Sequence, residues 1–148
     1  MRIGIVPERD SIVGWLYPGA FPEIPDPPAA FLTCPSFDDA AFTALWAATG
    51  KYDGKSEAVC YESSGCDVGV PHDAPDFVPM FAPQMVEDLA AIPDHERWRV
   101  AQQWALAHLG QRPNEQKSSL YKKVLRELCD LARSVSSTEQ RLLLLRDD

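Results

Sequence analysis

The chain has 148 residues, of which 45% are hydrophobic and 24% are charged. This length predicts a single globular domain spanning residues 1–148, and the composition argues against a disordered chain. Fourteen Lys and Arg residues against 22 Asp and Glu residues give a net charge of −8, which argues against a nucleic-acid-binding protein.

The N-terminal residues lack the features of a secretory signal. One Arg precedes a short apolar run, Ile3–Val6, that ends at Pro7, whereas a signal peptide needs about 7–15 apolar residues and a small-residue cleavage site. No apolar run in the sequence approaches the roughly 20 residues of a membrane span. We therefore expect a cytoplasmic protein with no membrane partner, whose four cysteines are reduced.

Two different segments are expected before residue 36. Arg2–Val6 is short and rich in β-branched residues, which predicts an edge or N-terminal strand. Residues 7–35 contain seven of the 13 prolines, and proline excludes a long helix because it lacks the amide donor and fixes φ. Aromatic and aliphatic side chains lie between these prolines, so we expect residues 1–35 to include an irregular proline- and aromatic-rich segment that packs on the domain.

A helix is predicted between Ser36 and Gly50. Ser36 can cap its start, with Asp39 three residues later as in a capping box, and Gly50 can end it in the left-handed conformation. Its core-facing stripe is formed by Phe42, Leu45, Trp46 and Thr49.

Short extended segments are predicted after this helix. Ala58–Tyr61 and Val68–Val70 indicate two strands of a hairpin, set in a polar stretch with glycine breakers. Residues 77–81 carry closely spaced apolar side chains and one proline, which favours an extended edge segment leading into a helix that begins at Pro83. A proline-rich ligand for an aromatic groove is disfavoured, because these side chains are too apolar to stay in water.

Three helices are predicted in the second half of the chain: Pro83–Ile92, His95–Leu109 and Ser119–Val135. Asp94 is expected to cap the second, and Gly110 to end it. The core-facing side of that second helix is predicted to consist of Trp98, Ala101, Ala105 and His108, with Trp104 beside them.

The C-terminal run Leu142–Leu145 is consistent with a short buried strand or with a further helical turn. The strand is the preferred interpretation. The predicted fold class is therefore α+β and predominantly helical, with about four helices and a few short strands.

Acidic residues are concentrated in the middle of the chain. Residues 38–96 contain twelve acids and two bases, whereas residues 97–148 contain six acids and ten bases. This asymmetry would speed association with a basic protein, although solubility alone also favours an acidic surface. The residues predicted to contact a partner are the acids and tyrosines of this segment: Asp38, Asp39, Tyr52, Asp53, Glu57, Tyr61, Glu62, Asp67, Asp73 and Asp76.

The sequence contains no specific catalytic motif. It has no Gly-x-Ser-x-Gly elbow, no glycine-rich phosphate loop and no His-Glu-x-x-His. Cys60, Cys66 and His72 follow one another at six-residue spacing, but structural zinc sites usually pair ligands two to four residues apart. We therefore expect no enzyme, no cofactor and no metal, and a small Cys/His metal protein or enzyme stays the least favoured alternative.

One set of spaced, mostly apolar positions covers roughly residues 77–145. It consists of Phe77-Val78-Pro79, Pro83-x-x-Val86-x-x-Leu89-Ala90, Trp98-x-x-Ala101-x-x-Trp104-Ala105, the helix Tyr121–Val135 and the tail Leu142–Leu145. This set resembles small bacterial immunity proteins of contact-dependent and type VI toxin systems. The resemblance implies a protein that binds a cognate toxin, with no catalytic residues shared across the class.

The favoured hypothesis is thus a cytoplasmic immunity-type protein that occludes the active site of a basic toxin through its acidic surface. A toxin met in the cytoplasm would act on cytosolic targets such as nucleic acid or nucleotides. The alternative is a non-catalytic adaptor or regulatory protein-interaction domain.

Overall fold

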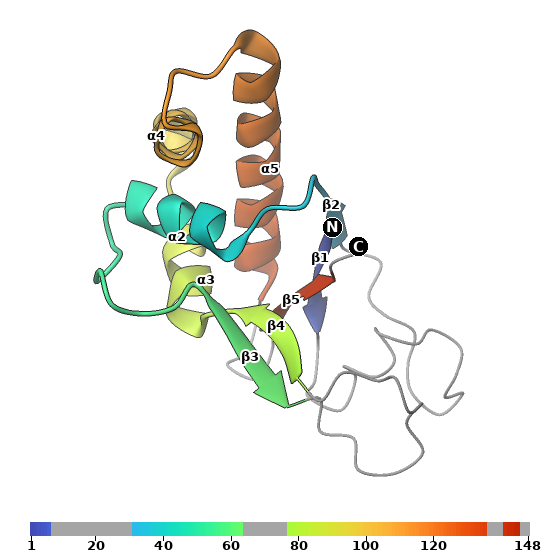
Figure 1. Cartoon of the computed structure of the whole chain (residues 1–148). Helices are drawn as coiled ribbons and strands as arrows, with labels where there is room; N and C mark the ends of the chain where they lie inside the picture. The colour runs from blue at the N-terminus through green and yellow to red at the C-terminus, as the bar shows by residue number, and fades with distance from the viewer. Residues whose placement is uncertain (7–30, 64–76, 136–140, 146–148) are drawn as a thin grey trace.

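The computed structural model describes residues 1–6, 31–63, 77–135 and 141–145. Within these ranges the chain forms an α+β fold that is predominantly helical, as predicted (Figure 1). The helices are α2 (Asp39–Ala48), α3 (Pro83–Ala90), the 3-10 helix η2 (Asp94–Glu96), α4 (Arg97–Leu109) and α5 (Glu115–Ser134). The strands are β1 (Arg2–Val6), β2 (Phe31–Thr33), β3 (Val59–Ser63), β4 (Phe77–Phe81) and β5 (Arg141–Leu145).

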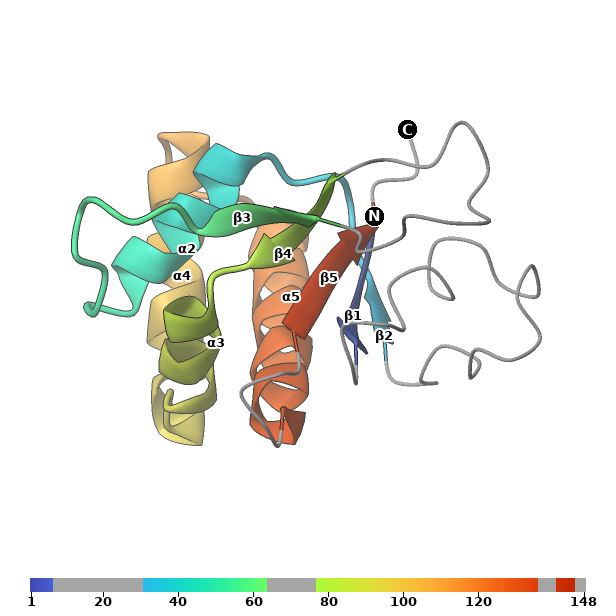
Figure 2. The ribbon, with the colours of Figure 1, turned by 90° about the horizontal axis from the view of Figure 1, so that it is seen from below.

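The strands form one five-stranded sheet in the order β2-β1-β5-β4-β3, with every pair antiparallel. The first and the last strand lie side by side near its centre, with Ile3 opposite Leu144. The helices gather on one side of the sheet (Figure 2). The tail Leu142–Leu145 is therefore a strand, as preferred from the sequence, and its Leu142 and Leu144 side chains are buried.

Three strand predictions need correction. β1 is the N-terminal strand, one of the two predicted possibilities, but it is not an edge, because β2 and β5 flank it. β2 lies within the segment predicted to be irregular; the rest of that segment, residues 7–30, lies outside the described residues. The partner of β3 is β4, whereas Val68–Val70, the partner expected from the sequence, also lies outside them.

Residues 77–81 are extended, as predicted, but they form an inner strand and not an edge. The register of Pro79 means that the β3–β4 ladder needs no N–H from it. The Ala82 amide donates to the Ala58 carbonyl at 2.9 Å, so these two residues form a hydrogen-bonded pair. From this pair on, hydrogen-bonded and non-bonded pairs alternate along the β3–β4 ladder. Pro79 stands opposite Tyr61, a position between bonded pairs, where its missing N–H costs this ladder no hydrogen bond.

Trp104 is the centre of the contact between α2, α4 and α5. Its side chain is fully buried, its Nε1 donates to the Ala41 carbonyl of α2 at 2.8 Å, and its ring centroid lies 4.7 Å from that of Tyr121 on α5. Trp98, which was predicted to face the core, is 53% exposed. At about 100° per residue it lies about 90° from the middle of the buried arc of α4, which places this large ring at the rim.

Asp38, rather than Ser36, caps α2. The Asp38 carboxylate accepts a hydrogen bond from the Ala41 amide at 2.8 Å, and the helix begins at the next residue. Phe37 precedes this cap and buries its ring against Phe42 and Trp104. The core contact of Phe37 thus fixes the point at which the chain enters the helix, and the capping role passes to the acid that follows it.

A buried carboxylate joins α2 to α3. Asp88 is 7% exposed and accepts a hydrogen bond from Trp46 Nε1 at 2.8 Å and another from Gln84 Nε2 at 3.1 Å. Hydrogen bonding is what makes a buried acid tolerable in a core. Together with the Trp104 bond to Ala41, this contact fixes α2 from two sides.

The turn between α3 and α4 is held by Arg133 near the end of α5. Its guanidinium donates to the carbonyl oxygens of Ala90 and Ile92 and to the Asp94 carboxylate. The Arg133 hydrogen bond and the nearby charge of Arg97 lower the pKa of Asp94. Asp94 was predicted to cap a helix starting at His95. Its carboxylate instead accepts a hydrogen bond from Arg133 and forms an ion pair with Arg97, and α4 starts at Arg97 after a turn of 3-10 helix.

No helix among the described residues is both long enough and apolar enough to cross a membrane.

Candidate partner-binding site

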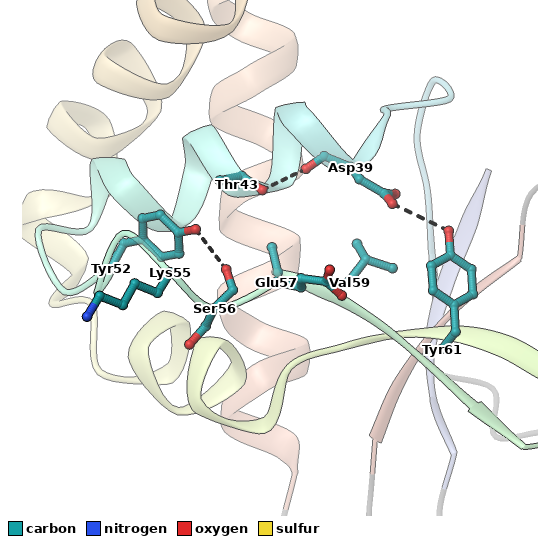
Figure 3. A pocket seen from close by; sticks show the side chains of 9 residues that line it. Asp39, Thr43, Tyr52, Lys55, Ser56, Glu57, Val59 and Tyr61 are labelled. Carbon is teal, nitrogen blue, oxygen red and sulfur yellow. Dashed lines mark hydrogen bonds between the residues drawn. The ribbon is translucent and has the colours of Figure 1, made fainter.

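A pocket of about 440 Å³ opens beside the outer face of α2 (Figure 3). Its other walls are the connection from α2 to β3 and the first part of β3 itself. Most of the lining side chains are polar, and two are tyrosines. The residues that line it are Asp39, Thr43, Tyr52, Lys55, Ser56, Glu57, Ala58, Val59 and Tyr61.

α2 supplies the wall formed by Asp39 and Thr43, which lie one turn apart on the helix. The Thr43 hydroxyl donates to the Asp39 carbonyl at 3.0 Å. The buried arc of the helix is centred near Leu45, roughly 100° from Asp39 and roughly 140° from Thr43, with Trp46 at its edge. This division of faces follows from the 3.6-residue period of the helix, and it directs the polar residues into the pocket.

The connection between α2 and β3 is ordered by a turn around Asp53. One carboxylate oxygen of Asp53 accepts the amides of Lys55 and Ser56, each at 2.8 Å, and the other accepts the Ser56 hydroxyl at 2.6 Å. Gly54 adopts a φ of +77°, a left-handed conformation that favours glycine. The Tyr52 hydroxyl donates to the Ser56 carbonyl at 2.7 Å, so this hydrogen bond joins two residues that line the pocket.

This turn is expected to depend on pH. Hydrogen bonds from the side chain and backbone of Ser56 lower the pKa of Asp53 from 3.8 to about 2. Because the folded-state pKa is depressed, the bonds contribute stability above the ordinary pKa of 3.8 and are lost as the pH falls through about 2. An NMR titration of the Asp53 carboxyl carbon should therefore show a midpoint near 2, and Ser56→Ala should raise it. A wild-type midpoint at 3.8 would contradict the turn as described.

Tyr61 brings β3 next to the start of α2. Its hydroxyl donates to Asp39 Oδ2 at 3.4 Å across 22 residues of sequence, and its side chain is 52% exposed. At the other end of the pocket, the Tyr52 ring packs on Trp46, with the two ring centroids 4.9 Å apart. Two tyrosines, one on the core and one half in solvent, therefore flank the carboxylates of Asp39 and Glu57 (Figure 3).

The ten predicted contact residues divide into three groups. Four of them, Asp39, Tyr52, Glu57 and Tyr61, line this one pocket. Asp38 and Asp53 lie beside it but serve the structure, the first as the cap of α2 and the second in its own turn. Of the remaining four, Glu62 lies in β3, and Asp67, Asp73 and Asp76 lie outside the described residues.

Sequence reasoning missed the uncharged part of the pocket and its one lysine. Thr43, Lys55, Ser56, Ala58 and Val59 line it without having been selected. Asp53-Gly54 followed by a serine is a recognisable turn pattern, since Asp tolerates turns and bonds to the backbone two residues on. That signal would have identified the loop that carries Lys55 and Ser56.

Asp38 also approaches a second cluster, on the α4 side of α2. Its Oδ1 lies 3.9 Å from His108 Nε2, and His108 Nδ1 lies 2.6 Å from the Tyr121 hydroxyl. Burial, and secondarily the charge of Asp38, raise the pKa of Tyr121. The cluster joins the cap of α2 to α4 and α5.

The described thiols have the character of core residues. Burial raises the pKa of Cys34 and of Cys129 to about 11 in each case, so both are protonated at neutral pH. Cys34 and Cys129 are free cysteines. The described residues contain no group of three metal-ligating side chains, and two members of the Cys60, Cys66 and His72 set lie outside them.

No protein-family model, curated protein or solved structure matches this chain. The resemblance to bacterial immunity proteins therefore depends on the core positions named from the sequence, and it stays a prediction.

Proposed function

We propose that the chain is a cytoplasmic immunity-type protein, which binds a basic cognate toxin and occludes its active site through the surface around the pocket. One observation carries the proposal. Four residues selected from the sequence as partner contacts, Asp39, Tyr52, Glu57 and Tyr61, line a single pocket.

The chemistry of this surface suits a basic protein cleft. Carboxylates supply charge complementarity, which mainly raises the association rate and fixes the register of a complex. Tyrosines are frequent at the centres of protein interfaces because they combine a large apolar ring with a polar tip. Here Tyr61 is half exposed beside Asp39, and Glu57 lines the same pocket.

The surface is also held in place before any partner arrives. α2 is fixed to the core by the Trp104 bond to Ala41 and by the Trp46 bond to Asp88. The loop is fixed by the turn around Asp53. A preorganised surface loses less conformational entropy on binding, so more of its contact energy contributes to affinity.

The experiment that tests the proposal compares two matched charge reversals. Asp39 and Glu115 are each the acid in the first turn of a helix, α2 and α5 respectively. Tagged wild-type protein, Asp39→Lys and Glu115→Lys are each used to capture partners from the native cell, and the captured partner is then purified for binding kinetics. We expect Asp39→Lys to weaken binding by about tenfold or more, largely through a slower association rate, while Glu115→Lys binds as the wild type does.

Two results would contradict the proposal in different ways. Equal affinity of the wild type, Asp39→Lys and a Glu57→Lys variant would place the contact elsewhere on the molecule. A partner that has no toxic activity, or whose activity is unchanged when the wild-type protein saturates it, would instead favour an adaptor.

A further inference from the structure

The polar groups of the pocket leave an unusual balance of donors and acceptors. Each hydroxyl that lines it donates its hydrogen back into the same wall. Thr43 donates to the Asp39 carbonyl, Tyr52 to the Ser56 carbonyl, Ser56 to the Asp53 carboxylate, and Tyr61 to the Asp39 carboxylate. What these groups still offer a ligand is lone pairs.

Two of the loop amides follow the same rule. The N–H groups of Lys55 and Ser56 both donate to Asp53 Oδ1. Glu57 adds an exposed carboxylate, which is a pure acceptor when ionised. The Lys55 ammonium is a donor, but its side chain extends away from Glu57 and Asp39 (Figure 3). The pocket therefore complements a ligand rich in donors and positive in charge.

We propose that the pocket binds a guanidinium group, presented by an arginine side chain of the protein partner; this inference rests on the proposed partner-binding function. A guanidinium carries five N–H donors and no acceptor, so it matches a wall that supplies acceptors. Its planar fork pairs with a carboxylate such as that of Glu57 through two parallel hydrogen bonds.

The tyrosine rings favour arginine over lysine. The Tyr61 side chain is 52% exposed at one end of the pocket, so its ring offers an apolar surface to a flat cation that enters the pocket. Guanidinium stacks on aromatic faces and is more weakly hydrated than an ammonium. A lysine would place a compact, strongly hydrated charge in the same space and would leave most of the acceptors unbonded.

The test uses the free side chain and needs no partner protein. Nα-acetyl-arginine amide and Nα-acetyl-lysine amide are titrated separately into the ¹⁵N-labelled full chain, and amide shifts are followed by NMR. We expect saturable shifts with arginine centred on Lys55, Ser56, Glu57 and Val59, and an affinity for lysine weaker by about threefold or more.

Two isosteric variants make the test specific. Glu57→Gln should weaken arginine binding by about two- to fivefold, since it removes the charge-assisted hydrogen bonds at a solvent-exposed site. Glu115→Gln, the same change on α5, should leave it unaltered. The spectra of both variants, outside the changed residues, report whether the fold is intact.

Shifts spread over the whole surface, equal affinities for arginine and lysine, or equal binding by Glu57→Gln would each overturn the guanidinium inference. None of these results would affect the partner-binding proposal, because that is judged by capture and kinetics with Asp39→Lys. Loss of partner binding in Asp39→Lys, together with no arginine shifts, would support the partner-binding proposal and reject guanidinium binding in the pocket.

Discussion

Trp104→Ala is expected to destabilise the protein by about 3–5 kcal/mol, the range for truncating a fully buried tryptophan. The change would open a cavity between α2, α4 and α5 and would leave the Ala41 carbonyl without its indole donor. Domains of this size have total stabilities of about 5–15 kcal/mol, so the variant would be marginally folded. Urea unfolding followed by fluorescence or circular dichroism measures the loss.

Trp104→Phe separates the loss of the ring from the loss of its hydrogen bond, and Trp98→Ala is the control. Trp104→Phe keeps much of the ring and removes the hydrogen bond to Ala41, so we expect an intermediate loss. Trp98→Ala removes a ring of the same size that is 53% exposed, and it should cost clearly less than Trp104→Ala. If Trp98→Ala were as damaging as Trp104→Ala, the orientation of α4 described here would be wrong.

Asp88→Ala is expected to cost about 1–3 kcal/mol, because it leaves the buried indole N–H of Trp46 without an acceptor. Asp88→Asn retains a carbonyl oxygen that can accept the same bond, so it should cost less. Since Tyr52 packs on Trp46, the amide signals of the pocket should shift in Asp88→Ala and stay closer to wild type in Asp88→Asn.

A double-mutant cycle checks that the effect passes through this one bond. In a Trp46→Phe background the indole donor is already gone, so Asp88→Ala should cost clearly less than it does in the wild type. Additive losses in urea unfolding would show that Asp88 stabilises the fold through other contacts.

Local patterns predicted the elements whose side chains repeat with a clear period. The apolar residues of α5 recur at three- and four-residue steps, and the structure buries them: Tyr121, Val124, Leu125, Leu128, Leu131 and Ala132. Pro83 begins α3 and Gly110 ends α4 with a φ of +69°, both as predicted. These features depend on residues within one or two turns of each other, so the sequence alone determined them.

Contacts between distant segments decided the rest of the fold. β1 and β5 pair in the middle of the sheet although they come from opposite ends of the described chain. Ser36 was a reasonable cap for α2 by residue type, yet Asp38 is the cap, because Phe37 between them is committed to the aromatic core. Residue type alone left Trp98 and Trp104 both available to the core, and the packing of α4 against α2 and α5 selected Trp104.

The candidate site shows the same division. Charge and aromatic content predicted Asp39, Tyr52, Glu57 and Tyr61, since these residue types report on surface chemistry without any knowledge of the fold. Their gathering into one pocket needs β3 to lie beside the start of α2, and the Tyr61 bond to Asp39 spans 22 residues. The sequence determined which charged and aromatic groups are available for the proposed partner site. The tertiary structure decided which of them face the same space, because burial of the whole core sets how helices and strands pack.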